Sequence, residues 1–312
     1  MEYPNPKIKF YKVRTMSQKL TVTFDFLREN WKPLLIFSLY LILPICLLQA
    51  FTMNSYIRFA FSMGYESASG AGNEFVFSFL RNFIMLFVFI ILGSSVLYAM
   101  VYSLMTQYES RESRLMKIKW EDIMSSFIRN VGKLLRVNLF LIGISLLISA
   151  LIVVFAILST WVLIILIPVA IIGVVAVMVP FTLFMPIYLF EEIPFFAALR
   201  KSFRYGFSFW GETLVIIVVF SLLANIVSGV TTIPWYFVIM FGEIFSLVES
   251  GAGFNNTIWY QFISYLLGIL QSYGVYISYI FSTIGIAFHY FHIREKKEGI
   301  SVDASIQNFE RL

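Results

Sequence analysis

The sequence predicts an all-α polytopic membrane protein with about six transmembrane helices in three hairpins, each preceded by a cytoplasmic amphipathic interfacial helix. Hydrophobic residues make up 59% of the 312 residues, whereas about 45–50% is usual in soluble domains. No charged residue occurs between Arg136 and Glu191. That stretch is long enough for two helical crossings of a bilayer at roughly 20 residues each. The basic residues are also distributed as a polytopic protein requires, as described below.

Six apolar stretches are long enough to be predicted as spans. They are Pro33–Thr52, Phe83–Met105, Leu139–Leu158, Trp161–Phe190, Thr213–Thr232 and Ile258–Phe291. The third and fourth are separated only by Ser159 and Thr160, which predicts a tight hairpin. Pro168, Pro180 and Pro186 predict kinks in the fourth, because proline removes a helical hydrogen bond. The stretch 233–245 is short, and we expect it to form an outer interfacial helix.

Lysine and arginine set the orientation, because cytoplasmic loops of membrane proteins are enriched in them. In the six-span arrangement, 21 of the 23 basic residues fall on one side, and only Arg58 and Arg81 fall on the other. We therefore expect both termini in the cytoplasm, with a single integral membrane domain over 1–312. It comprises a cytoplasmic segment 1–32, a bundle 33–292 and a cytoplasmic tail 293–312. The net charge of +5 then reflects topology, and no nucleic-acid partner is predicted.

The segment "KSFRYGFSFW" (201–210) alternates cations with aromatic residues. Together with the residues before it, it has an apolar helical face opposite a cationic one. The apolar face holds Phe195, Phe196, Leu199, Phe203, Phe207 and Trp210. Such a helix next to a span is typical of the lipid headgroup region. Similar stripes precede the first and third spans, which predicts three repeated units of surface helix and hairpin.

The tail "AFHYFHIREKKEGISVDA" (287–304) resembles the ending of a group of uncharacterised bacterial six-span proteins. The group includes the membrane domain associated with glycerophosphoryl diester phosphodiesterases and the YciC-like inner-membrane proteins. "PFFAALRKSF" (194–203) is similar to the segment before their fifth span. The resemblance implies a multi-pass protein of the bacterial inner membrane. It implies no activity, because the phosphodiesterase barrel of fused relatives is absent.

No catalytic signature or cofactor motif is recognisable, so the sequence predicts no enzyme and no cofactor. His289 and His292 have the i, i+3 spacing of a metal pair, but a metal site needs further ligands. We interpret them as an interfacial polar belt at the inner end of the last span. Cys46 is the single cysteine and is expected to be a small lipid-facing or packed residue of the first span.

Small and polar residues form stripes on the last two spans. They are Ser221, Asn225, Ser228 and Thr232 on the fifth and Ser264, Gly268, Gln271, Ser278 and Ser282 on the sixth. Such stripes allow helices to pack closely, which is our preferred interpretation; the alternative is a polar lining for a substrate. A cavity lined by Asn225 and Gln271 would favour the alternative.

Two functions remain open. The first is a non-enzymatic protein that organises the membrane by binding lipids, another membrane protein or a second copy of itself. Its candidate contacts with an anionic lipid or a partner are Arg129, Lys133, Arg200, Lys201 and Arg204. The second is a permease or exporter of a poorly charged small molecule, which the kinked fourth span and the polar stripes favour.

Overall fold

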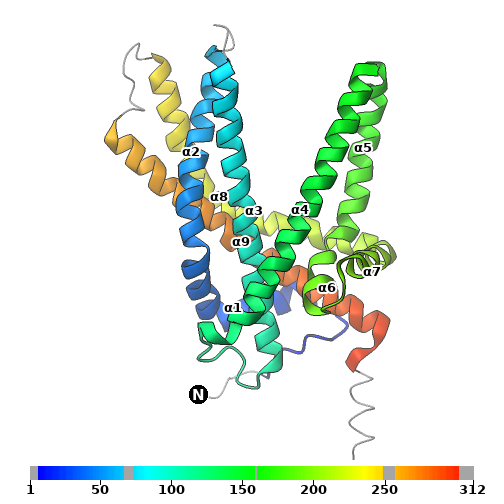
Figure 1. The fold of residues 1–312 in the computed structure, drawn as a ribbon. Coiled ribbons are helices and arrows are strands. Elements are labelled where there is room, and N and C mark those ends of the chain that lie inside the picture. The colour runs from blue at the N-terminus through cyan, green and yellow to red at the C-terminus, as the bar shows by residue number, and fades with distance from the viewer. Residues whose placement is uncertain (1–5, 67–72, 159, 249–256, 302–312) are drawn as a thin grey trace, which may run out of the picture. The chain divides into compact units, whose positions relative to one another are not determined.

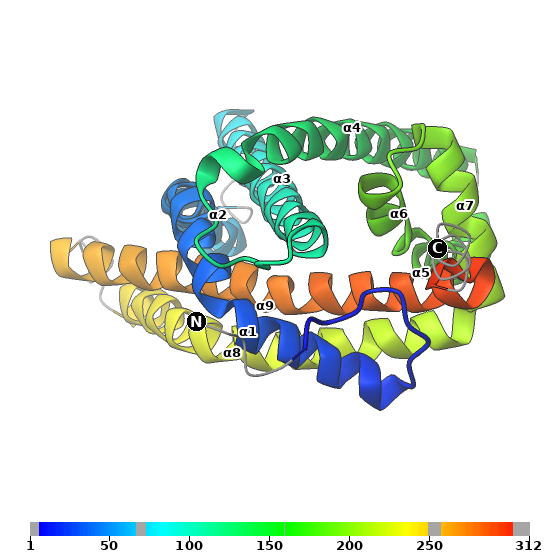
Figure 2. The same ribbon diagram turned by 90° about the horizontal axis from the view of Figure 1, so that it is seen from below.

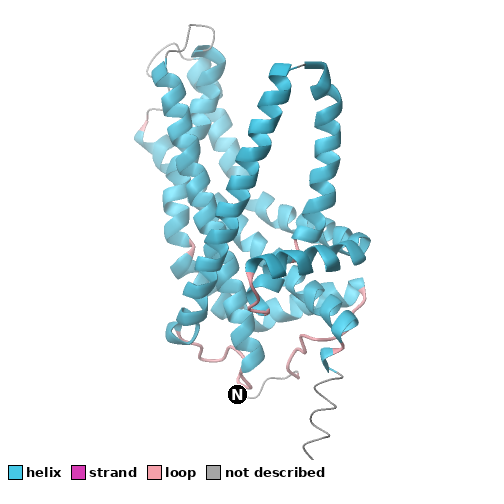
Figure 3. Cartoon of the chain, turned by 45° about the vertical axis from the view of Figure 1, so that its right-hand side comes forward, coloured by secondary structure: helices cyan, strands magenta, loops and turns pink. Residues whose placement is uncertain are grey.

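A computed structural model describes residues 6–66, 73–158, 160–248 and 257–301 of the chain. Within these ranges the chain is helical, with short loops and no strand (Figure 3). The centres of the two predicted outer loops and the end of the predicted tail lie outside the described residues.

The described residues form α-helices, which are labelled in Figure 1. They are α1 (Met16–Leu41), α2 (Leu43–Glu66), α3 (Asn73–Ser110), α4 (Trp120–Leu158), α5 (Thr160–Phe181), α6 (Phe184–Phe190), α7 (Phe195–Ser208), α8 (Trp210–Val248) and α9 (Ile258–Glu298).

The helices confirm the predicted class of all-α polytopic membrane protein. Within the described ranges, five segments are long and apolar enough to cross a membrane: Phe77–Ser110, Trp120–Val154, Pro168–Phe190, Trp210–Phe245 and Ile258–Glu298. A sixth crossing results if α1 and α2, which are bent by 53° at their junction, form one broken span. In the apolar part of α4, only 6% of the residues are buried within the protein. This is expected of a helix whose sides contact lipid.

Helices α4 and α8 each join segments that the sequence predicts to be separate. The stretch 233–245 is no separate outer helix, because α8 continues from Trp210 to Val248 through Pro234. Apolar residues continue on both sides of this proline, and membrane helices tolerate proline inside them. Likewise, the amphipathic stretch 120–136 and the third predicted span form one uninterrupted helix, α4. Of the three predicted proline kinks, the one at Pro180 coincides with the break between α5 and α6, whereas α5 continues through Pro168 and Pro186 lies within α6.

The chain divides into two compact units. Unit 1 comprises Met1–Pro33, Val101–Ser221 and Phe281–Leu312, and unit 2 comprises Leu34–Met100 and Leu222–Ile280. Helices α1, α3, α8 and α9 contribute residues to both units. The predicted domain boundaries stay a prediction.

The core of unit 1 is aromatic and is built around the last turns of α9. The ring of Phe10 contacts four other rings, those of Phe26, Tyr108, Phe288 and Phe291. The segment before α1 therefore packs against α9, as the view in Figure 2 shows. On α9, Ser282 Oγ donates a 3.2 Å hydrogen bond to the carbonyl oxygen of Phe220 on α8.

Helix α7 is the amphipathic helix of the "KSFRYGFSFW" segment, and it packs against α5 and α6. Its buried side consists of Ala198, Ser202, Tyr205 and Gly206. A Cβ atom on Gly206 would lie 2.3 Å from Cα of Pro180 on α5, so only glycine permits this contact. Phe196 and Phe207 are 72% and 57% exposed, which leaves an aromatic face directed away from unit 1.

In unit 2, α9 packs against α1, α3 and α8 through glycines and hydroxyls. A Cβ on Gly274 would lie 2.2 Å from Oγ1 of Thr231 on α8, and one on Gly93 of α3 would lie 2.0 Å from the hydroxyl of Tyr276. The hydroxyl of Ser38 lies 2.7 Å from that of Tyr273. Close packing through small residues is typical of membrane helices.

Candidate functional site: a cationic pocket beside two buried histidines

His289 and His292 share one face of α9, and both are buried in unit 1, with 0% and 3% exposure. Their ring centroids are 6.1 Å apart. The predicted interfacial belt is therefore an internal pair. The part of the chain that the structure describes contains no group of three or more His, Cys, Asp or Glu side chains that could hold a metal ion.

His289 is held by a lysine and a threonine. Lys19 on α1 places Nζ 3.1 Å from Nδ1 of His289, and Oγ1 of Thr213 on α8 lies 3.0 Å from Nε2. The same hydroxyl donates to the carbonyl oxygen of Phe209 at 2.9 Å. One arrangement of protons satisfies all three contacts: the ammonium donates to Nδ1, and Nε2–H donates to Thr213. His289 is then neutral, and it accepts a hydrogen bond from a buried cation.

His292 has a complementary geometry. Its Nδ1 accepts a 3.0 Å hydrogen bond from the backbone N–H of Arg14, so the neutral ring carries its proton on Nε2. That nitrogen is buried and lies 3.4 Å from Oε2 of Glu212, but it makes no hydrogen bond in the described part of the chain. A buried donor without a partner is unfavourable by about 1–3 kcal/mol.

These groups adjoin a pocket of about 610 Å³ in unit 1. Its charged lining residues are Arg14, Lys19, Glu212 and Lys296, together with His292. The apolar side chains of Val13 and Val215 line it as well and are 53% and 51% exposed. Three cations and a single carboxylate among these lining residues make the pocket electropositive.

The Glu212 carboxylate pairs with Lys19 and Lys296, and both distances are long. It lies 3.4 Å from Nζ of Lys19 and 3.6 Å from Nζ of Lys296, and its side chain is 45% exposed. Both distances exceed the roughly 2.7–2.9 Å of a strong charge-assisted hydrogen bond. The carboxylate therefore leaves part of the cations' hydrogen-bonding capacity unused.

Arg14 is a fixed charge at the edge of the pocket. Its guanidinium donates to the carbonyl oxygens of Phe10 at 2.8 Å and of Lys9, which closes a turn in the segment before α1. Burial lowers the pKa of Arg14 to about 10, so the side chain stays charged at neutral pH.

A second charged cluster in unit 1 connects α7 with the end of α9. Lys201 lies 2.6 Å from carboxylate oxygens of both Glu191 and Glu298, and Arg294 lies 2.8 Å from Glu298. The hydroxyl of Tyr205 donates to Glu298. Burial, and then this bond to Glu298, raise the pKa of Tyr205. Lys201 is thus engaged inside the protein.

The other predicted cationic contacts differ in their surroundings. Arg129 forms an exposed 2.6 Å ion pair with Glu192. Lys133 donates to the carbonyl oxygen of Tyr188 at 3.1 Å and lies over its ring. Arg200 and Arg204 are exposed and form no ion pair with any residue that the structure describes. They are the two candidates with charges directed to the surroundings.

The predicted polar stripe of α9 is mostly turned inward. Ser264 and Ser278 are buried and donate to carbonyl oxygens of their own helix at 3.1 and 2.7 Å. Gly268 is in close contact, because a Cβ there would lie 3.3 Å from Cβ of Ala50 on α2. Ser264, Gly268 and Ser278 therefore belong to the packed side of α9 in unit 2. In unit 1, Ser282 forms its hydrogen bond with the carbonyl oxygen of Phe220 on α8.

The predicted stripe of α8 is not buried in the same way. Ser221 and Asn225 are exposed, and Ser228 and Thr232 are half-buried. Ser228 Oγ donates to the carbonyl oxygen of Asn225 in its own helix. The residues of α8 that meet α2 or α9 in unit 2 include Thr231, Trp235 and Gly242, none of which is among the four predicted positions.

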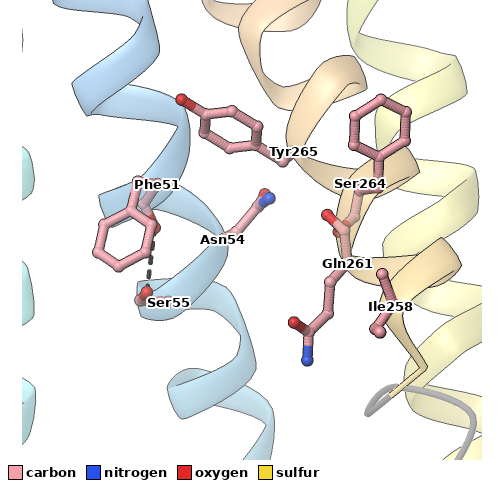
Figure 4. Close-up of a pocket in the computed structure, with 8 residues that line it drawn as sticks. Phe51, Asn54, Ser55, Ile258, Gln261, Ser264 and Tyr265 are labelled. Carbon is pink, nitrogen blue, oxygen red and sulfur yellow. Dashed lines mark hydrogen bonds between the residues drawn. The ribbon is translucent and has the colours of Figure 1, made fainter.

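Two pockets adjoin α2 and α9 in unit 2. One has about 420 Å³, and Figure 4 shows Asn54 of α2 pointing into it opposite Gln261 and Ser264. Oδ1 of Asn54 also accepts a 3.0 Å hydrogen bond from Nε1 of the buried Trp235. The other has about 440 Å³ and is lined by Gln271 but not by Asn225.

Sequence reasoning identified the histidine pair but missed Arg14 and Lys19. One signal was available for Lys19, because it lies on the helical face of α1 that also carries the buried Val22 and Phe26. A lysine on such a face requires a buried partner.

Comparison of the chain with models of protein families, with curated proteins and with solved structures found no match.

Proposed function

We propose that the chain is a non-enzymatic membrane protein that binds the anionic headgroup of a lipid in the pocket of Arg14, Lys19 and Lys296. One observation carries the proposal: these three cations line one pocket of about 610 Å³ whose lining holds a single carboxylate, that of Glu212, and of the three Glu212 pairs only with Lys19 and Lys296, at 3.4 and 3.6 Å. The ligand expected in such a site is an anion, because it supplies the charge that Glu212 alone does not balance.

The chemistry of the pocket suits a phosphate group. Phosphate oxygens accept several hydrogen bonds and form short, strong ones with ammonium groups. Nε2–H of His292 is a buried donor beside the pocket that lies 3.4 Å from Oε2 of Glu212 and forms no hydrogen bond with the described residues. An acceptor oxygen near Glu212 would satisfy this donor together with Lys296.

The apolar rim of the pocket favours a lipid over a free anion. Val13 and Val215 line the pocket and are exposed, so hydrocarbon next to the headgroup would cover them. Burial of apolar surface contributes roughly 25 cal/mol per Å². A phosphate ion would leave both side chains uncovered.

We also infer that the pocket faces the cytoplasm of a bacterium and that both termini lie there. The support is the bias of 21 among 23 basic residues and the resemblance of the tail to YciC-like inner-membrane proteins. Membership in that group is part of the proposal. Anionic lipids attract cations at the cytoplasmic surface by about 1 kcal/mol per residue.

The test measures how lipids change thermal unfolding of the purified protein. Dioctanoyl phosphatidylglycerol is expected to raise the Tm, whereas dioctanoyl phosphatidylcholine and inorganic phosphate are expected to raise it less. Lys296→Gln should weaken the effect, with affinity falling about five-fold for a loss of about 1 kcal/mol. Lys297→Gln is the matched control, because Lys297 is a neighbouring exposed lysine outside the lining. Equal responses of both variants, or an equal response to inorganic phosphate, would contradict the proposal.

The alternative function is a permease or exporter of a poorly charged small molecule. One observation favours it, namely that the 440 Å³ pocket in unit 2 is lined by Gln271 and by no charged residue. A permease exposes its site to each side in turn. Gln271→Cys in a Cys46→Ala background would then react with an impermeant thiol reagent from both sides of sealed vesicles, and reaction from one side only would favour a binding protein.

A further inference from the structure

The 440 Å³ pocket of unit 2 is polar at positions predicted to lie within the membrane. Its lining comes from α2, α3 and α9 and includes Gln49, Ser94, Tyr98, Gln271 and Tyr276. Gln49, Ser94 and Gln271 belong to the predicted first, second and sixth spans. Polar groups in a bilayer are unfavourable unless they are hydrogen-bonded. The presence of amides and hydroxyls from three helices around one cavity therefore requires an explanation.

The amide oxygens are already engaged. Tyr276 donates its hydroxyl to Oε1 of Gln49 at 2.8 Å, and Ser272 donates to Oε1 of Gln271 at 3.2 Å. Gly93 makes the first contact possible, because any Cβ there would overlap the Tyr276 hydroxyl. The glutamine side chains are thereby oriented, and neither NH₂ group donates a hydrogen bond to another residue of the described ranges.

We propose that this pocket binds an uncharged amphiphile whose hydroxyl or carbonyl oxygens accept hydrogen bonds from the amides of Gln49 and Gln271. The lining contains no charged side chain, so an ionic ligand would have no counter-charge. Met53, Ile90, Leu97 and Val275 supply hydrocarbon walls, which suit an acyl chain. The volume lies within the roughly 300–1,000 Å³ of small-molecule sites. This site is separate from the headgroup pocket and does not depend on it.

The test uses the purified full chain with radiolabelled 1,2-dioctanoylglycerol as the probe. Wild type is expected to bind it, and Gln271→Leu should weaken binding about five-fold, the effect of one net hydrogen bond. Gln261→Leu is the matched control on the same helix, because Gln261 lines the other pocket of unit 2. Lys296→Gln should leave binding unchanged, which separates this site from the headgroup pocket.

A second variant fills the cavity and keeps both amides. Val275→Phe adds volume at a lining position and should reduce binding at least as strongly as Gln271→Leu. Size-exclusion profiles and thermal unfolding establish that each variant is folded. Failure of wild type to bind the probe, or equal binding by wild type, Gln271→Leu and Val275→Phe, would overturn the proposal. Dioctanoyl phosphatidic acid has the same chains and a charged headgroup. It should compete with the probe at least about ten-fold less well than unlabelled dioctanoylglycerol, because its charge would be desolvated without a partner. Equal competition by the two compounds would also overturn the proposal.

Discussion

The ammonium of Lys19 lies 3.1 Å from Nδ1 of His289, and the two side chains are 3% and 0% exposed. A buried lysine is retained where its charge meets acceptors. Here the acceptors are a neutral imidazole and the more distant Glu212 carboxylate. The pair joins the beginning of α1 to the last turns of α9, and Lys19 lines the cationic pocket.

This contact predicts that stability depends more on a hydrogen-bond acceptor at position 289 than on the size of the side chain there. His289→Phe removes the acceptor and leaves a buried ammonium group undersatisfied, so we expect a loss of stability of about 1–3 kcal/mol. His289→Gln retains an acceptor and should lose less. Thermal unfolding of both variants in the same detergent measures the difference, and equal Tm values would show that the contact contributes little.

The hydropathy of the sequence was enough to predict the class and most of the long helices. The break after Pro180 coincides with a kink that was predicted because proline removes a helical hydrogen bond, but α5 continues through Pro168. The continuation of α8 through Pro234 was not predictable. Whether a proline breaks a helix depends on its neighbours in space, which local sequence does not specify.

The cationic pocket was not predictable from spacing. Lys19 and His289 are separated by 270 positions in the sequence, and no local pattern joins them. Charge patterning likewise placed Lys201 with Arg200 and Arg204 on one cationic face. It could not reveal that Lys201, unlike Arg200 and Arg204, forms ion pairs with Glu191 and Glu298. The contact of Lys201 with an anionic lipid stays a prediction, which these two ion pairs do not favour.

The contact of α7 with α5 depends on the absence of a side chain at Gly206. Gly206→Ala would bring a methyl group within 2.3 Å of Cα of Pro180, and such overpacking typically costs about 1–3 kcal/mol. Gly132→Ala in α4 is the control, because a Cβ there meets nothing within 4 Å. We expect that control to be neutral or stabilising by up to about 1 kcal/mol, since alanine is a better helix former. Similar Tm values for the two variants would argue against close packing of α7.

The exposed aromatic face of α7 is expected to contact lipid. Phe196→Glu and Phe207→Glu should impair membrane assembly, because each removes an apolar group whose burial contributes about 1.5–3 kcal/mol. Ser208→Glu introduces the same charge at an exposed polar position and should be tolerated. The yield of monodisperse protein from isolated membranes is the measurement. If all three variants assembled equally well, the aromatic face would not be interfacial.

The proposed orientation can be tested with single cysteines in a Cys46→Ala background. Ser113 and Ser301 are exposed on segments placed in the cytoplasm, so cysteines there should resist an impermeant thiol reagent in intact cells. Cysteines at Ser69 and Gly253, in the predicted outer loops, should react. Permeabilised cells provide the control, since all four cysteines should then be labelled. The reverse pattern in intact cells would invert the topology.

Lysine and arginine on the cationic face of α7 should differ in their effects. Lys201→Gln leaves the carboxylate of Glu191, which is only 6% exposed, without its closest cation, so stability should fall by about 1–3 kcal/mol. The double variant Arg200→Gln, Arg204→Gln removes no ion pair of the described residues and should keep the Tm of wild type. It should, however, retain less anionic lipid on purification, by about 1 kcal/mol per charge removed. Lipid mass spectrometry and thermal unfolding on the same samples separate the two roles. An unchanged lipid content in the double variant would show that these arginines serve orientation only.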